Sequence, residues 1–263
     1  MTVDNATKLN RLINFLPRGA VVTSDYLRKQ GYGDSLVQEY KKRRWLESVE
    51  RGAYKLPGDS VEWFGGVYAM QKQLNINIHV GAKTSLSLQG YAQYIPVNGN
   101  VPVCHLFGYR NERLPAWFKK ADWNTKILYF PTKLFSKNLT DTYVNYQYRE
   151  FEIRLSSPER AAMEMCYLIP RLQEFEEAGE IIENLTVLRP GIVQLLLESC
   201  RFIKVKRLFL YFADRAGHDW FNELNLANIN LGSGQRQIIK DGILDKKYLI
   251  TIPKKSGYES FNF

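Results

Sequence analysis

The chain has 263 residues, 45% hydrophobic and 24% charged, with a formal net charge of +9; this composition is typical of a folded globular protein and argues against disorder. It has neither an apolar run of about eighteen residues nor a basic-then-apolar leader at its N-terminus, so we expect a cytoplasmic protein without a membrane span. Cys104, Cys166 and Cys200 are odd in number and widely spaced, which favours reduced thiols over a disulfide framework or a zinc site.

The positive charge is concentrated in the first part of the chain. Residues 1–60 contain 11 Lys/Arg and 7 Asp/Glu, and residues 61–150 contain 10 and 5, whereas residues 151–263 contain 15 of each. Neutralising phosphates releases counterions, so this excess of cations favours binding of a polyanion by the first 150 residues. The alternative is that the charge serves solubility alone.

Residues 1–57 predict a winged helix-turn-helix. Apolar spacing indicates a helix over residues 5–15, and a second short helix, capped by Thr23 or Ser24, ends at Gly31. A third helix is expected over residues 36–45, with Asp34 or Ser35 as its cap. LESVERGAYKLPG then alternates apolar and polar residues about Arg51-Gly52, which is typical of a two-stranded hairpin.

The third helix and the hairpin predict DNA binding, because a basic helix fits the major groove and a basic hairpin can lie beside it as a wing. Side chains near the helix start would reach base edges, and the cations of its last turns and of the wing would meet the backbone or the minor groove. The predicted contacts are Ser35, Gln38 and Lys42 to bases, Lys41, Arg43 and Arg44 to phosphates, and Arg51, Tyr54 and Lys55 on the wing. A solvated basic face and a protein-docking winged helix are the alternatives.

Residues 58–156 predict a mixed α+β region with antiparallel strands. Helices are expected over residues 61–75, where Gly65-Gly66 is a weak point, and from residue 82 to about Gly90. Segments rich in aromatic and β-branched residues predict the strands, at residues 76–80, 101–109, 126–130, 142–150 and 151–156.

Residues 157–263 predict a helical region that ends in a hairpin, so the whole chain is assigned to the α+β class. Ser156-Ser-Pro-Glu159 combines a capping box with an early proline and starts a helix. Further helices are expected at residues 172–185, 190–200 and 203–217, and a hairpin over residues 235–253 with Asp241-Gly242 as its turn. Residues 232–236 lack the second glycine and the Lys-Ser/Thr of a Walker motif, so we expect a tight turn.

Other functions leave weaker signals. Asp141, Glu152 and Arg154 resemble the sparse carboxylate set of a metal-dependent nuclease, although alternating charges are common on the solvent face of a strand. A ligand-responsive regulator with a pocket in the aromatic middle region is a second alternative. The acidic face of the helix at residues 172–185 could dock a basic partner or the chain's own basic N-terminal region, or it is simply solvated. The sequence predicts no catalytic residue, cofactor or metal ion.

Several segments together carry a family resemblance that spans nearly the whole chain. They are ERGAYKLPG and GAKTSLSLQGYAQY in the first half, and SPERAAMEM, ENLTVLRP, VKRLFLYFADRAGHDWF, LGSGQR and KKYLITIP in the second. In their order the chain resembles the AbiEi antitoxins of type IV toxin–antitoxin systems, which are bacterial phage-resistance modules.

This resemblance implies a non-enzymatic antitoxin that also represses its own operon. The N-terminal winged helix of that family binds inverted repeats upstream of the operon, so two copies are expected on one operator. The C-terminal region counteracts a nucleotidyltransferase-like toxin without requiring a stable complex with it. The candidate residues for antitoxicity are the charged positions within matching segments, namely Lys204, Lys206, Arg207 and Arg236.

Overall fold

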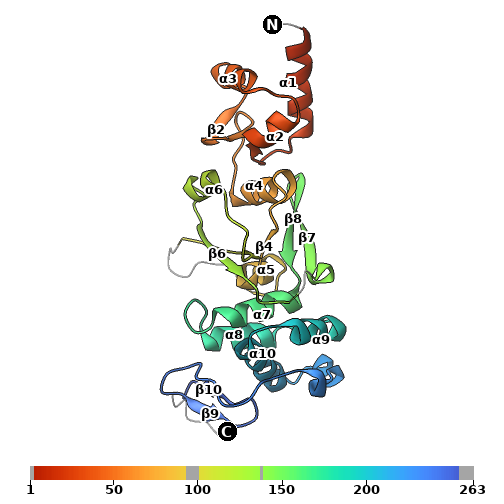
Figure 1. The fold of residues 1–263 in the computed structure, drawn as a ribbon, viewed down its shortest axis with the longest axis vertical. Coiled ribbons are helices and arrows are strands. Elements are labelled where there is room, and N and C mark those ends of the chain that lie inside the picture. Colours follow the sequence, from red (N-terminus) through yellow and green to blue (C-terminus); the bar gives the residue numbers. More distant parts are fainter. Residues whose placement is uncertain (1–2, 93–100, 137–138, 255–263) are drawn as a thin grey trace, which may run out of the picture. The chain divides into compact units, whose positions relative to one another are not determined.

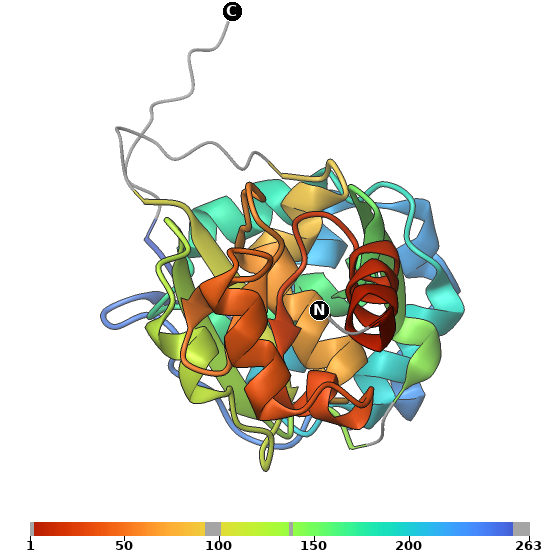
Figure 2. The same ribbon diagram turned by 90° about the horizontal axis from the view of Figure 1, so that it is seen from above.

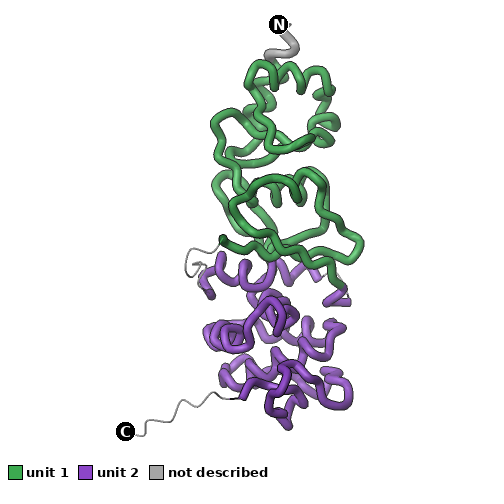
Figure 3. Tube along the Cα trace, turned by 90° about the vertical axis from the view of Figure 1, so that its left-hand side faces the viewer, with its two compact units in different colours: residues 1–80, 95–132, 144–155 green, residues 81–94, 133–143, 156–263 purple. Residues whose placement is uncertain are grey.

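The protein is described by a computed structural model that covers residues 3–92, 101–136 and 139–254. The chain forms two compact units, which Figure 3 shows in different colours. Unit 1 comprises residues 1–80, 95–132 and 144–155, and unit 2 comprises residues 81–94, 133–143 and 156–263. The predicted winged helix and most of the predicted middle region therefore belong to unit 1, and the rest of that region joins the C-terminal helices.

The N-terminal part of unit 1 is a winged helix-turn-helix. Its elements are α1 (Val3–Phe15), β1 (Val22–Thr23), α2 (Ser24–Lys29), α3 (Asp34–Lys42), β2 (Glu47–Glu50) and β3 (Ala53–Lys55), red to orange in Figures 1 and 2. The three strands pair antiparallel in the order β1-β3-β2. Leu12 of α1, Leu27 of α2 and Tyr40 of α3 are fully buried, so the predicted apolar faces do form one core.

The start of α3 differs from its prediction. Gly33 precedes the first helical residue, and α3 receives no side-chain cap from the described residues, so the predicted capping by Asp34 or Ser35 is wrong. The carboxylate of Asp34 lies within the first turn, and it pairs with the guanidinium of Arg28 on α2 at 3.2 Å. The acidic group still lies at the positive end of the helix dipole.

The end of α3 also differs from its prediction. The helix stops at Lys42, and Arg44 adopts a left-handed backbone with φ of 56°. This turn allows the Trp45 amide to donate to the Tyr40 carbonyl oxygen at 2.8 Å, with the two rings packed edge to face. The predicted helix through residue 45 is therefore too long, because the chain must turn back early to bury Leu46 and begin the wing.

The second part of unit 1 is built on a five-stranded sheet. Its elements are α4 (Trp63–Tyr68), the π-helix η1 (Ala69–Gln73), β4 (Ile78–Val80), β5 (Val103–Tyr109), α6 (Ala116–Lys120), β6 (Lys126–Thr132), β7 (Tyr143–Tyr148) and β8 (Phe151–Ser156). The strand order is β6-β5-β4-β8-β7. The predicted antiparallel pairing holds for β4 and β5, whereas β5 with β6 and β4 with β8 are parallel.

Gly65 and Gly66 of α4 are sites of close packing. A Cβ at Gly65 would collide with the carbonyl oxygen of Gly19, and a Cβ at Gly66 would collide with the ring of Phe118. The Gly65 carbonyl also accepts the Val21 amide at 3.3 Å, next to strand β1. The predicted weak point in the helix is therefore the position at which the winged helix and α6 both approach α4.

Unit 2 is mainly helical. Its elements are α5 (Ala82–Leu88), η3 (Thr140–Thr142), α7 (Pro158–Leu168), α8 (Phe175–Glu183), α9 (Pro190–Ser199), α10 (Ile203–Ala216), η4 (Asp219–Glu223), η5 (Leu226–Asn228), β9 (Ile243–Asp245) and β10 (Ile250–Ile252). Helix α7 is the centre of this unit, because α5, α8, α9 and α10 all pack against it. Its side chains are accordingly buried almost throughout.

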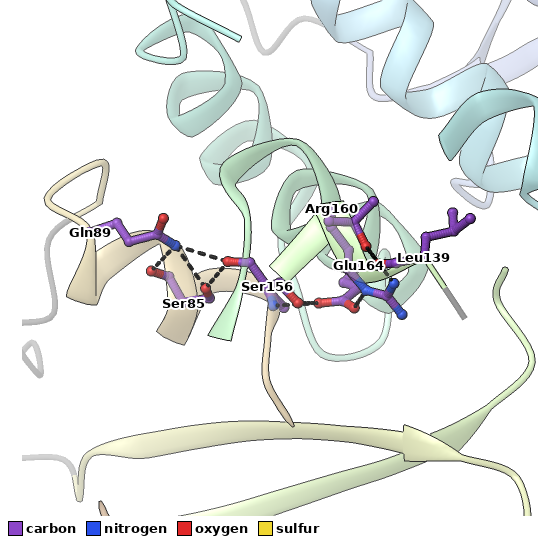
Figure 4. A network of polar contacts seen from close by, with 8 residues as sticks. Ser85, Gln89, Leu139, Ser156, Arg160 and Glu164 are labelled. Carbon is purple, nitrogen blue, oxygen red and sulfur yellow. Dashed lines mark hydrogen bonds and ion pairs between the residues drawn. The ribbon is translucent and has the colours of Figure 1, made fainter. Parts of the chain in front are cut away.

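A buried polar network joins α5 to α7 (Figure 4). The carboxylate of Glu164 is almost fully buried, and it accepts the Arg160 Nε at 2.8 Å and the Ser156 hydroxyl at 2.6 Å. The Ser156 carbonyl oxygen in turn accepts the Ser85 hydroxyl at 2.7 Å and the Gln89 amide at 3.0 Å. The buried charge of Glu164 is thus both paired and hydrogen-bonded, as buried charges need to be.

Two predicted details of unit 2 are wrong. Helix α7 begins after Ser157 with Pro158 in its first turn, but no capping box forms within the described residues, because the Glu159 carboxylate binds Arg189 instead. The terminal hairpin consists of β9 and β10, which are joined through residues 246–249, not through Asp241-Gly242. No helix in the described part of the chain has the length and hydrophobicity needed to cross a membrane.

Candidate nucleic-acid interface

The outer face of α3 presents three polar side chains at helical spacing. Ser35, Gln38 and Lys42 are all exposed, and steps of three and four residues place them on one face. The opposite face of α3 is held in the core by Val37 and Tyr40, with exposed fractions of 3% and 0%. The predicted base-reading residues therefore share a surface that points away from the core.

The other cations around α3 divide into two groups. The Lys41 amino group lies 5.7 Å from the ring of Tyr54 on the wing, and Arg43 pairs with Glu39 at 3.0 Å and lies over the Trp45 ring. Lys41 and Arg43 therefore tie the helix to its surroundings. Arg44 is exposed just past the helix end, and among the described residues it has no ionic partner.

The wing presents only one of its three predicted DNA contacts openly. Arg51 is exposed at the turn, where Gly52 supplies the left-handed backbone with φ of 84°. Tyr54 is only 7% exposed, and burial, helped by the negative charge of Asp34, raises the pKa of its hydroxyl. Lys55 pairs with Glu47 across the hairpin at 3.2 Å and donates to the Asp59 carbonyl oxygen at 2.7 Å. Tyr54 and Lys55 thus hold the wing together.

The four candidate antitoxicity residues lie in unit 2, and three of them serve as internal hydrogen-bond donors. Lys204 donates to the carbonyl oxygens of Tyr167 and Ile169, and burial lowers the pKa of its amino group. Lys206 and Arg207 are buried beneath the segment that leads to the terminal hairpin. Arg236 alone of the four is exposed.

Arg207 shapes the loop at residues 232–236, for which the sequence predicts a tight turn. Gly232 and Gly234 have left-handed backbones with φ of 65° and 69°, which agrees with the predicted tight turn. The Arg207 guanidinium donates to four carbonyl oxygens, those of Leu231, Gly232, Gly234 and Leu249. A side chain of the protein itself therefore occupies the inside of this loop.

The residues of the nuclease alternative are divided between the two units. Asp141 and Glu152 are exposed and belong to different units, and Arg154 donates to the Asn77 side chain at 2.8 Å and to the Ile78 carbonyl oxygen at 3.0 Å. Within residues 3–92, 101–136 and 139–254, no three His, Cys, Asp or Glu side chains are grouped so that they could hold a metal ion.

A groove in unit 2 was not predicted from the sequence. It has a volume of about 970 Å³ and lies between α8, α10 and the terminal hairpin. Phe175, Tyr211 and Phe212 line it, together with the acidic face of α8. The spacing of Glu176, Glu180 and Glu183 predicts that they share one face of α8. It does not predict that α10 and the terminal hairpin lie beside that face. The groove therefore lies outside residues 58–156, the aromatic middle region that the alternative of a ligand-responsive regulator requires.

The two antiparallel wing strands and the exposed polar face of α3 define the class of winged-helix proteins. The sequence matches two family models, described as "Transcriptional regulator, AbiEi antitoxin N-terminal domain" over residues 5–97 and "Transcriptional regulator, AbiEi antitoxin, Type IV TA system" over residues 102–253. The chain therefore belongs to the AbiEi family of antitoxins and transcriptional regulators of type IV toxin–antitoxin systems, and the predicted resemblance is confirmed.

A solved structure has a similar fold. It is the crystal structure of the RV2827C protein from Mycobacterium tuberculosis, which is 14% identical in sequence, with a TM-score of 0.59 over 94% of this chain and 90% of that one. At this identity the likeness concerns the fold alone. No curated protein matches the sequence.

Proposed function

We propose that the protein is a non-enzymatic repressor that binds inverted repeats upstream of its own operon in the cytoplasm. The observation that carries this proposal is the exposed face of α3, on which Ser35, Gln38 and Lys42 are aligned. Arg44 follows the helix and Arg51 stands at the tip of the wing, so cations flank that face. A helix of this kind in the major groove reads base edges, and cations beside it meet phosphates.

The mechanism divides affinity from specificity. Arg44 and Arg51 would bind phosphates and release counterions, which supplies affinity for any duplex. Gln38 can form two hydrogen bonds with adenine, which supplies discrimination. Two copies on an inverted repeat would double both contributions and match the symmetry of such a site.

The test measures binding to a duplex from upstream of the gene and to a scrambled duplex, over a range of salt concentrations. Arg44→Ala with Arg51→Ala should weaken binding to both duplexes and lower the slope of log affinity against log salt by about two for each bound copy, because each copy loses two phosphate contacts. Gln38→Ala should mainly reduce the difference in binding free energy between the upstream and the scrambled duplex, by about 1–3 kcal/mol.

The matched control is Lys240→Ala with Lys246→Ala, which removes two exposed cations of unit 2 and should leave both affinities unchanged. Equal affinity of the wild type for the two duplexes would refute operator recognition. Unchanged binding by the Arg44 and Arg51 variant would refute the proposed docking face.

We further propose that unit 2 counteracts a nucleotidyltransferase-like toxin encoded beside this protein. The support is the family, whose description names both an antitoxin and a transcriptional regulator, together with the neutral charge of residues 151–263. These residues form most of unit 2, and a segment without net charge gains little from binding phosphates, so it is free for another task.

A further inference from the structure

A second basic surface lies beside the wing. Helix α6 packs against β2, and β2 is an edge strand of the winged-helix sheet. The helix and the loop before it carry four exposed cations, which are Arg110, Arg113, Lys119 and Lys120. These elements all belong to unit 1, and the packing of α6 against β2 places the four cations beside the outer edge of the wing.

Helix α6 is short but firmly held. Phe118 is 1% exposed and packs into the space that Gly66 leaves open, with its ring 5.1 Å from that of Trp123. The Trp123 indole donates to the Phe118 carbonyl oxygen at 2.8 Å, and Trp117 is also buried. Two buried aromatic side chains on one side of the helix leave the next two residues, Lys119 and Lys120, to face solvent.

The charges of this surface are available to a partner. In the described part of the chain, the four cations form no ion pair with a protein carboxylate. The nearest acidic residues along the chain are Glu112 and Asp122, and the Asp122 carboxylate accepts the Asn124 amide. On the neighbouring strand, Glu47 pairs with Lys55 and Glu50 accepts the Arg51 amide. Positive charge therefore predominates at the outer edge of the wing.

We propose that α6, together with Arg110 and Arg113, binds the sugar–phosphate backbone of the duplex beyond the stretch that the wing contacts. The inference rests on the proposed function. A wing that lies on one stretch of the DNA backbone brings the edge strand β2 and its neighbour α6 toward the adjacent stretch of DNA. Lysine and arginine side chains bind phosphates as charges and carry no base preference. The surface extends the footprint and adds affinity without adding specificity.

The test compares two lengths of duplex in fluorescence anisotropy at about 0.1 M salt, where phosphate contacts are still strong. One duplex is a fluorescein-labelled mixed sequence of about four helical turns, and the other is trimmed to about one turn. On the long duplex, Lys119→Ala with Lys120→Ala should weaken binding about tenfold and lower the salt slope by about two. On the short duplex the same variant should bind like the wild type.

Lys240→Ala with Lys246→Ala is the charge-matched control and should equal the wild type on both duplexes. The melting temperature of each variant is measured, and if the alanine variant melts lower, Lys119→Gln with Lys120→Gln takes its place, because glutamine is also a good helix former.

The outcomes separate the two proposals. If the wild type binds neither duplex, nor the upstream DNA, the proposed function fails and this inference fails with it. If the wild type binds and the Lys119 and Lys120 variant matches the control on the long duplex, only the extended surface is refuted. Equal weakening on both duplexes would also overturn it, since the contact would then lie within the wing's own footprint.

Discussion

Arg207 shows how a single side chain can shape a loop. It is among the largest fully buried side chains, and its guanidinium bonds to four carbonyl oxygens over distances from 2.6 to 3.1 Å. The guanidinium has five donors in a planar fork, whereas a lysine ammonium has three donors at one point. Only arginine can therefore satisfy carbonyl groups that surround the side chain on several sides.

Arg207→Lys should consequently lower the free energy of unfolding by about 3 kcal/mol, since the carbonyl groups around the side chain lose partners while a buried charge remains. Urea denaturation measures the change. Arg236→Lys alters an exposed arginine of the same region and should have almost no effect. Equal stability of the two variants would show that the four hydrogen bonds contribute little.

At the scale of elements, an ion pair joins the starts of two helices. Glu159 lies in the first turn of α7, and Arg189 immediately precedes α9. The buried Glu159 carboxylate accepts the Arg189 amide at 3.1 Å and its side-chain Nε and Nη2 at 2.8 and 3.0 Å. Burial, the largest single influence, would raise the pKa of Glu159, but the hydrogen bonds that its carboxylate accepts, led by that from the Arg189 side chain, together outweigh it, and the pKa is lowered.

This lowered pKa gives the pair a defined pH dependence. A carboxylate with a lower pKa in the folded state adds stability above its unfolded-state pKa, and that contribution is lost as the pH falls through the folded-state pKa. Glu159→Gln should lower the free energy of unfolding by about 1–2 kcal/mol at pH 7, and the difference should shrink in acid. Urea unfolding of the wild type and the variant, from pH 7 into acid, measures this difference in unfolding free energy, and Glu183→Gln at an exposed position is the control. A difference that stays constant with pH would show that ionised Glu159 does not stabilise the fold.

The elements that were predicted correctly are those with a strong local pattern. The apolar faces of α1 and α3 and the Arg51-Gly52 turn made the winged helix readable. Helix α6 was missed because five residues are too few to show a helical period. The parallel pairings were missed because partners far apart in sequence leave no local signal. The hairpin turn was predicted at the wrong place. Asp241-Gly242 does form a turn, as its sequence indicates, but this turn precedes β9 and does not join β9 to β10.

The candidate sites were predictable only as far as residue type and helix face allow. The alignment of Ser35, Gln38 and Lys42 follows from the helical period, so it could be read in advance. The burial of Tyr54 and Arg207 could not be predicted in this way. The sequence shows that a residue is polar or charged, but not that carbonyl groups or a neighbouring strand enclose it. Tertiary contacts decide which cations remain free for a partner.

At the scale of the whole molecule, the two proposed activities fall in different compact units. Every proposed DNA contact belongs to unit 1, and all four antitoxicity candidates belong to unit 2. Of these four, Arg236 alone can be changed without removing a donor to the carbonyl oxygens of another segment. Arg44→Ala with Arg51→Ala should therefore lose repression of a promoter–reporter fusion but still protect growth when the toxin is co-expressed. Arg236→Glu should repress normally and protect less. Immunoblots check that the variants are present at equal protein levels. A variant that loses both repression and protection at an unchanged protein level would show that the two activities do not belong to separate units.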